Sequence, residues 1–259
     1  MLRPRIIPCL LVRDKGLVKT IGFSDPKYVG DPINAVRIFN EKSVDELIVL
    51  DIDATVRVHE PDYRMIENFA AETCMPLCYG GGVKTARQAK AIIGLGVEKV
   101  AISSAAIGDP GLISQVADAV GSQSAVIVLD VKARRGGGYE VWTHNGRVNT
   151  GRSPREVATE LERIGVGEIV LNSIDNDGRM KGYDLAMVEQ VWDVINVPLT
   201  VLGGAGSLED IGELIRRFGV IGAAAGSMFV FKGIYRAVLI NYPTAAERDR
   251  LILDCLNTA

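Results

Sequence analysis

Long apolar runs are missing from this sequence of 259 residues. A membrane-spanning helix needs ~20 consecutive apolar residues, and no stretch of the chain approaches that length. The first ten residues also lack the apolar stretch and the cleavage site of a signal peptide. We therefore expect a cytoplasmic protein that makes no contact with a membrane.

Histidine and cysteine are also scarce, with two and four residues respectively. Protein metal sites are commonly built from clusters of these side chains. Cys74 and Cys78 are close in sequence, but His59 and His144 lie near neither of them, so we predict no metal site and no cofactor. So few cysteines in a cytoplasmic protein are expected to be thiols. A formal net charge of -3 gives no reason to expect nucleic-acid binding.

Eight short apolar runs recur along the chain, as is typical of strands buried on both faces of a parallel sheet. They cover residues 5–12, 46–52, 76–81, 99–103, 125–131, 168–173, 198–204 and 220–226. Segments of helical period separate most of them, at residues 31–43, 62–74, 85–96, 154–165 and 207–219. Eight strand–helix units predict an α/β fold, a single (β/α)8 TIM barrel over residues 1–259, with a doubly wound open sheet as the alternative.

An internal repeat favours the barrel over the open sheet. Residues 81–104 align with residues 203–227, which contain one extra residue, and residues 45–53 align with residues 167–175. Two similar halves of four units each, closing on one another, predict a barrel with pseudo-twofold symmetry.

Local signals mark the ends of helices and the two long loops. The expected N-caps are Asp31, Thr85, Ser153 and Ser207. The loop at residues 15–31 is a candidate lid. The insertion at residues 134–151 contains Asn145-Gly146, which predicts a tight hairpin turn.

Ligands of such barrels bind at the C-terminal ends of the strands, where a phosphate signature occurs in both halves. Glycines let backbone N–H groups approach an anion, and the start of the following helix adds a favourable dipole. The candidate residues are Gly81, Gly82 and Ser104 in the first half, and Gly203, Gly204, Gly226 and Ser227 in the second. We predict a ligand with a phosphate at each end; the alternative is a structural turn that duplication copied. Asp177-Gly178 is either a turn or a further contact to this ligand.

Asp130 ends the fifth strand and should face the predicted mouth, where a carboxylate is unfavourable without a function or a partner. We expect it to act as a general acid or base, with a structural ion pair to Lys132 as the alternative. The repeat places Leu11 at the corresponding position of the first strand. Leu11 is therefore either ordinary core or the place of a missing second acid.

Four charged residues lie at or just before strand starts, at the opposite end of the barrel. They are Arg5, Glu46, Lys99 and Glu168. If the strands close in order, these side chains form a ring of alternating charge. The residues alone favour a solvated rim of salt bridges, and the alternative is a gate that seals an axial passage.

Motifs along essentially the whole chain resemble the cyclase subunit of imidazole glycerol phosphate synthase (HisF). They include RIIPCL at residues 5–10, DELIVLDI at 45–52, GSQSAVIVLDVK at 121–132, SIDNDG at 173–178 and GGAG at 203–206. The resemblance implies a (β/α)8 barrel that binds a bisphosphorylated aminoimidazole precursor. It also implies that ammonia reaches this barrel from a docked class I glutaminase (HisH-like).

The same resemblance implies roles for particular residues. The seven glycine and serine residues at the mouth would hold the phosphates. The four charged residues at strand starts would form the ammonia gate, and Glu98 would lie near the face on which the glutaminase docks.

The departures from the family pattern fall at the mouth. Asp130 matches one of the family's two catalytic aspartates, and Leu11 stands in place of the other. The other departures are Ser103 where the family has asparagine, Leu202 where it has serine and Asn172 where it has threonine. Leucine cannot exchange a proton, so a reaction that needs both carboxylates should slow by at least ~10²–10⁴-fold.

This combination resembles a paralogous branch of cyclase-like proteins from bacterial surface-polysaccharide (lipopolysaccharide) gene clusters, associated with acetamidino sugars. The resemblance implies a barrel that conducts ammonia from a glutaminase to a separate ATP-dependent N-acetyl-sugar amidotransferase. Two alternatives stay open. One is a working histidine-pathway cyclase that uses Asp130 alone or borrows a carboxylate such as Asp53. The other is a phosphosugar-binding scaffold without ammonia transfer.

Overall fold

The computed structural model describes residues 3–257, and its parallel strands form a closed barrel. In barrel order the strands are β1 (Arg5–Arg13), β4 (Leu47–Asp51), β5 (Leu77–Gly80), β6 (Lys99–Ile102), β7 (Ala125–Ala133), β10 (Glu168–Ser173), β11 (Leu199–Leu202) and β12 (Gly222–Ala225). Strand β12 pairs in parallel with β1, so Arg5 lies opposite Gly222. This pairing confirms the (β/α)8 barrel and excludes the open sheet. That the domain extends over all of residues 1–259 stays a prediction, because residues 1, 2, 258 and 259 lie outside the described residues.

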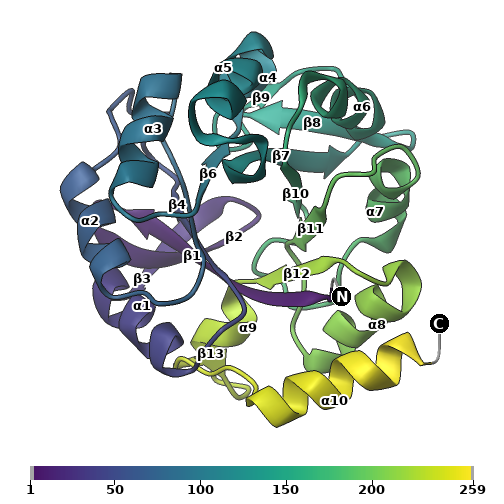
Figure 1. The fold of residues 1–259 in the computed structure, drawn as a ribbon. Helices are drawn as coiled ribbons and strands as arrows, with labels where there is room; N and C mark the ends of the chain where they lie inside the picture. The colour runs from purple at the N-terminus through teal and green to yellow at the C-terminus, as the bar shows by residue number, and fades with distance from the viewer. Residues whose placement is uncertain (1–2, 258–259) are drawn as a thin grey trace.

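Helices surround the barrel, as Figure 1 shows in a view down the strands. They are α1 (Pro32–Glu41), α2 (Tyr63–Ala71), α3 (Ala86–Gly94), α4 (Ser104–Gly108), α5 (Gly111–Val120), α6 (Pro154–Ile164), α7 (Leu185–Trp192), α8 (Leu208–Phe218), α9 (Ser227–Val230) and α10 (Ala245–Leu256). A short 3-10 helix covers Ser122–Ser124. No helix within residues 3–257 is long and apolar enough to cross a membrane.

The four predicted N-caps are confirmed, and they explain where their helices begin. Each cap side chain accepts a hydrogen bond from the backbone N–H three residues further on. Thr85 and Ser153 also take part in capping boxes, with Gln88 and Glu156 respectively. The α6 helix ends at Gly165, whose φ of 101° lies in the left-handed region that favours glycine.

Both long loops fold into antiparallel hairpins that extend barrel strands. Residues 15–31 contain β2 (Gly16–Ile21) and β3 (Ser24–Gly30), and β2 pairs with β1. The insertion after β7 contains β8 (Tyr139–Thr143) and β9 (Val148–Asn149), and β8 pairs with β7. The hairpin turn at Asn145-Gly146 is confirmed, with φ values of 60° and 70°.

The predicted half-barrel repeat is visible in these extensions. The first strand of each half carries an antiparallel partner, so Leu11 pairs with Val18 and Asp130 pairs with Trp142. The last strand of each half leads into a short helix, α4 after β6 and α9 after β12. Leu11 and Asp130 therefore occupy equivalent places in the two halves.

Apolar side chains fill two separate layers. The outer layer lies between strands and helices and includes the fully buried Phe39 and Phe69. The inner layer fills the barrel itself and comprises Ile7, Cys9, Ile48, Cys78, Ala101, Val126, Val128, Val170, Leu202 and Ala224. A (β/α)8 barrel is thus a packed core with a charged base below and a mouth above, and these two ends carry the polar groups.

Candidate functional site

One pocket opens at the C-terminal ends of the barrel strands. Its lining includes all nine residues predicted to bind phosphate: Gly81, Gly82, Ser104, Asp177, Gly178, Gly203, Gly204, Gly226 and Ser227. Asp130 and Leu11 line the same pocket. The structure therefore brings the predicted mouth residues together, from both halves of the barrel.

The two Gly-Gly turns have backbone conformations that favour glycine. Gly81 and Gly82 have φ values of 129° and 73°, and Gly203 and Gly204 have values of 94° and 118°. A Cβ atom on Gly81 would come within 2.6 Å of the Asp51 carbonyl oxygen. Turn geometry alone therefore accounts for the glycines, and phosphate binding stays a prediction.

Asp177 holds the β2–β3 hairpin against the mouth. Its carboxylate accepts a hydrogen bond of 2.6 Å from the Thr20 hydroxyl and one of 3.2 Å from the Phe23 N–H. Burial raises the pKa of this carboxyl group, although the Thr20 hydrogen bond opposes the shift. A carboxylate repels a phosphate, so the neighbouring Gly178 backbone is the better anion contact of the predicted pair.

Asp130 is enclosed by the barrel but keeps one side toward the pocket. The Asn172 amide donates a hydrogen bond of 2.9 Å to its Oδ1. Burial raises the pKa of Asp130 to about 7. The alternative of an ion pair with Lys132 is not observed: the Lys132 ammonium lies 5.3 Å from the centre of the Trp142 ring.

Leu11 presents an apolar surface to this pocket. It is half-buried and packs with Leu50 against the inner barrel layer. Leu202 and Val128 also line the mouth. The position that matches Asp130 in the first half therefore contributes packing and no proton-transfer group.

Asp53 is paired with two arginines, outside the pocket lining. Its Oδ2 lies 3.0 Å from Arg13 Nε and 3.0 Å from Arg57 Nη2, and the residue is absent from the pocket lining. Asp175 accepts a hydrogen bond of 2.9 Å from the Ala133 N–H and is likewise outside the lining. The alternative in which Asp53 replaces the lost carboxylate would require both of its ion pairs to break.

Sequence reasoning missed Lys19, which reaches the mouth from β2. The Lys19 side chain is buried, and its ammonium donates a hydrogen bond of 2.8 Å to the Cys9 carbonyl oxygen. Burial lowers the pKa of this lysine. A lysine inside the apolar run GLVKTI was the available signal, because such a position is normally occupied by an uncharged residue.

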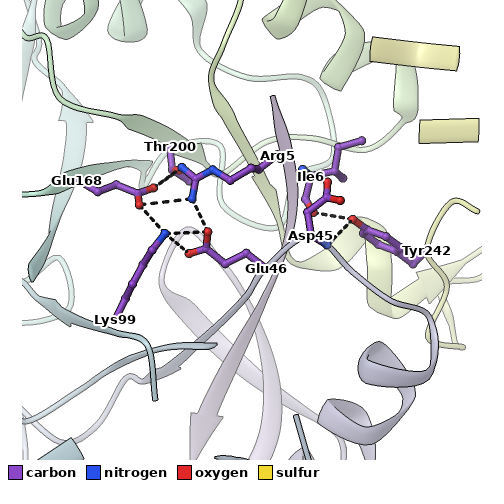
Figure 2. Close-up of polar contacts among 8 residues, drawn as sticks. All are labelled: Arg5, Ile6, Asp45, Glu46, Lys99, Glu168, Thr200 and Tyr242. Carbon is purple, nitrogen blue, oxygen red and sulfur yellow. Dashed lines mark hydrogen bonds and ion pairs between the residues drawn. The ribbon is translucent and has the colours of Figure 1, made fainter. Parts of the chain in front are cut away.

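The four charged residues at the base form a closed ring, drawn in Figure 2. Lys99 Nζ lies 2.9 Å from Glu46 and 2.9 Å from Glu168. Arg5 pairs with Glu46 through one guanidinium nitrogen and with Glu168, at 2.7 Å, through another. Each cation therefore contacts both carboxylates. Thr200 joins the ring unforeseen and donates a hydrogen bond of 2.6 Å to Glu168.

The two carboxylates of the ring are buried, at 3% and 4% exposed for Glu46 and Glu168. The expectation of a solvated rim is therefore wrong for these residues. Burial and the Glu168 charge raise the pKa of Glu46. Burial opposes ionisation of Glu168 as well, but Arg5 and Lys99 outweigh it and lower the pKa of that residue.

The inner layer lies between the ring and the mouth and consists of aliphatic side chains with two cysteines, Cys9 and Cys78. Burial raises the pKa of Cys9 to about 12 and also raises the pKa of Cys78. Both thiols are therefore neutral at physiological pH. Glu98, next to Lys99, is exposed at the base of the barrel, and its predicted place at a protein interface stays a prediction.

Taken from base to mouth, the geometry defines a class: a (β/α)8 barrel with a ligand pocket above an apolar interior and a buried ring of charges below. A family model described as "Histidine biosynthesis protein" matches residues 5–235. The chain belongs to this family, and within it to the homologues of imidazole glycerol phosphate synthase subunit HisF.

Relatives of this chain fall at two levels of similarity. A "Putative imidazole glycerol phosphate synthase subunit HisF" of Leptospira borgpetersenii is 53% identical, over 97% of this chain and 99% of its own. A "Putative imidazole glycerol phosphate synthase subunit hisF3" of Vibrio vulnificus is 54% identical, over 97% of each. The "Imidazole glycerol phosphate synthase subunit HisF" of Streptococcus sanguinis is 38% identical, over 88% of this chain and 91% of its own.

Proposed function

We propose that this barrel conducts ammonia. In this proposal a class I, HisH-like glutaminase docks at the base near Glu98, and ammonia passes the ring of Arg5, Glu46, Lys99 and Glu168. It leaves at the mouth for a separate ATP-dependent amidotransferase, which forms an acetamidino group on an N-acetyl sugar of a surface polysaccharide. The observation that carries the proposal is a closed, buried ring at the base combined with Leu11 at the mouth.

The apolar interior supports this proposal on physical grounds. Moving an ion into an apolar medium is very unfavourable, whereas a small neutral amine meets a much lower barrier. The inner layer consists of aliphatic side chains and two cysteines with raised thiol pKa values. Such a lining favours the passage of neutral ammonia over that of ammonium.

Coupled amidination tests the proposal. The barrel, its glutaminase and the sugar amidotransferase are combined with ATP and an N-acetyl sugar, with either glutamine or ammonium chloride as nitrogen source. We expect Lys99→Met to change the glutamine-dependent rate severalfold and to leave the ammonium-dependent rate nearly unchanged, because external ammonia need not pass the ring. An unchanged ratio of the glutamine-dependent rate to the ammonium-dependent rate, measured on variant protein that circular dichroism shows to be folded, would support a phosphosugar-binding scaffold instead.

A second candidate function is the cyclase reaction of histidine biosynthesis, which the retained Asp130 favours. We expect cyclase turnover, with ammonium salt and the bisphosphorylated precursor, to be at least ~10²-fold below that of the Streptococcus sanguinis relative, because a second acid is missing. Leu11→Asp should raise the rate. Leu11→Asn is the matched control, since the asparagine side chain has the same shape as that of aspartate and cannot ionise. Wild-type turnover equal to that of the relative would contradict the ammonia-conducting proposal.

A further inference from the structure

A second polar cluster adjoins the ring and is centred on Asp45, the residue before Glu46 (Figure 2). Asp45 Oδ2 accepts a hydrogen bond of 2.9 Å from the Ile6 N–H. Its other oxygen lies 3.4 Å from Arg3 Nη2 and 3.5 Å from Arg248 Nε. One carboxylate thus connects the start of β1 to helix α10.

Tyr242 completes this cluster from the segment that precedes α10. Its hydroxyl donates a hydrogen bond of 2.7 Å to the Ile6 carbonyl oxygen and accepts one of 3.3 Å from the Asp45 N–H. The side chain is 9% exposed. Its ring lies 5.2 Å from that of Phe229, and the Arg248 guanidinium lies 5.0 Å from its centre. The hydroxyl is therefore held in place from both sides.

At the level of the ring the sheet joins β1 to β12 but does not join β1 to β4. The ladder between β1 and β4 begins at Cys9 and Ile48, so Arg5 and Glu46 both precede it. Without ladder hydrogen bonds, the relative position of these two residues depends on other contacts. Asp45 and Tyr242 supply such contacts, because both bind the backbone of Ile6. Ile6 follows Arg5 in the sequence, and Asp45 precedes Glu46.

We propose that Tyr242 and Asp45 are positioning residues for the ring. Tyr242 fixes the backbone beside Glu46 to the backbone beside Arg5, and the segment from Tyr242 to Arg248 thereby sets how the ring closes. The positioning role concerns geometry alone and holds whether or not ammonia passes. Only its consequence for ammonia transfer rests on the proposed function.

Tyr242→Phe tests the positioning role with little loss of packing, because it removes the hydroxyl alone. We expect carbon-13 NMR of the glutamate carboxyl groups to show altered titration of Glu46 and Glu168, with signals assigned through Glu46→Gln and Glu168→Gln. A crystal structure of the variant should show the Arg5–Glu46 pair lengthened or broken. Unchanged titration and unchanged ring geometry would overturn the proposal.

Tyr139→Phe is the matched control, since its hydroxyl donates a hydrogen bond of 2.7 Å to Asp184, outside the ring. It should leave both glutamate titrations as in the wild type. Asp45→Asn provides a second route, because it removes the charge that Arg3 and Arg248 contact. It should alter the same two glutamate signals, and no change in them would count against the proposal.

Coupled amidination separates this inference from the proposed function. If Tyr242→Phe changes the ring and also the ratio of glutamine-dependent to ammonium-dependent rates, both are supported. If it changes the ring and leaves that ratio unaltered, the positioning role stands and the ring is not the ammonia gate. A general loss of folded protein would lower both rates together and leave the ratio unchanged.

Discussion

Lys99→Met lowers the free energy of unfolding by about 3–5 kcal/mol at pH 8, on the expectation for a buried ion pair that loses one partner. Lys99 contacts Glu46 and Glu168 at 2.9 Å each, and both carboxylates are almost completely buried. Methionine has a similar length but carries no charge. Arg5 alone would then face two buried carboxylates, so one of them would be left without a full counter-charge.

Urea unfolding at several pH values checks this result. The unpaired carboxyl group should have a higher pKa in the folded state than in the unfolded state. The variant is therefore most stable below the unfolded pKa and loses stability as the pH rises toward the folded pKa. The deficit relative to wild type should therefore grow between about pH 5 and pH 8. Lys15→Met is the control: its side chain is 81% exposed, and the expected change is within about 0.5 kcal/mol. A deficit of that size for Lys99→Met would mean that the ring is solvated.

Asp130→Asn is expected to stabilise the protein at pH 8, by about 2 kcal/mol. Burial raises the pKa of Asp130 to about 7, against an unfolded value near 4. A carboxyl group whose pKa is raised on folding contributes stability that is fully present below its unfolded pKa of about 4 and is lost progressively as the pH rises to about 7. Part of the carboxylate faces the pocket, so water reduces the penalty below the full shift. Asparagine keeps the hydrogen bond from Asn172 and carries no charge.

The pH dependence distinguishes this effect from a general change in packing. Asp130→Asn and wild type should have nearly equal unfolding free energies below about pH 4, should diverge between about pH 4 and pH 7, and should keep a constant difference above about pH 7. Asp118→Asn, on an exposed position of α5, should change little at either pH. A difference that is constant at all pH values would show that folding does not raise the pKa of Asp130. The same variant should abolish any residual cyclase turnover, because it removes the retained acid.

Much of the fold was predictable because its local signals agree with its tertiary structure. The apolar runs, the N-caps such as Ser153 and the Asn145-Gly146 turn each specify an element on their own. The hairpin at residues 15–31 was harder to predict, because β3 is largely exposed and lacks an apolar face. Strand β3 pairs with β2, and β2 is held in place by tertiary contacts such as that of Thr20 with Asp177.

The residues of the candidate site were predictable, but their burial and their partners were less so. The repeat placed Leu11 and Asp130 at equivalent positions of the two halves, and the positions of strand starts placed Lys99 near Glu168. Sequence spacing does not reveal how deeply a side chain is buried, so the ring was expected to be solvated. Sequence spacing also does not show which carboxylates form ion pairs. The pairing of Asp53 with Arg13 and Arg57 depends on tertiary contacts and could not be predicted.

The ring has a consequence for how it could open. It contains two cations and two carboxylates, so it has no net charge when all four side chains are ionised. Such a group has a weak field beyond its own dimensions, and it neither attracts nor repels a distant ion. Pulling the cations away from the carboxylates would create separated charges in a medium of low polarity. A protein that opens the ring must therefore bring polar groups of its own to the base of the barrel.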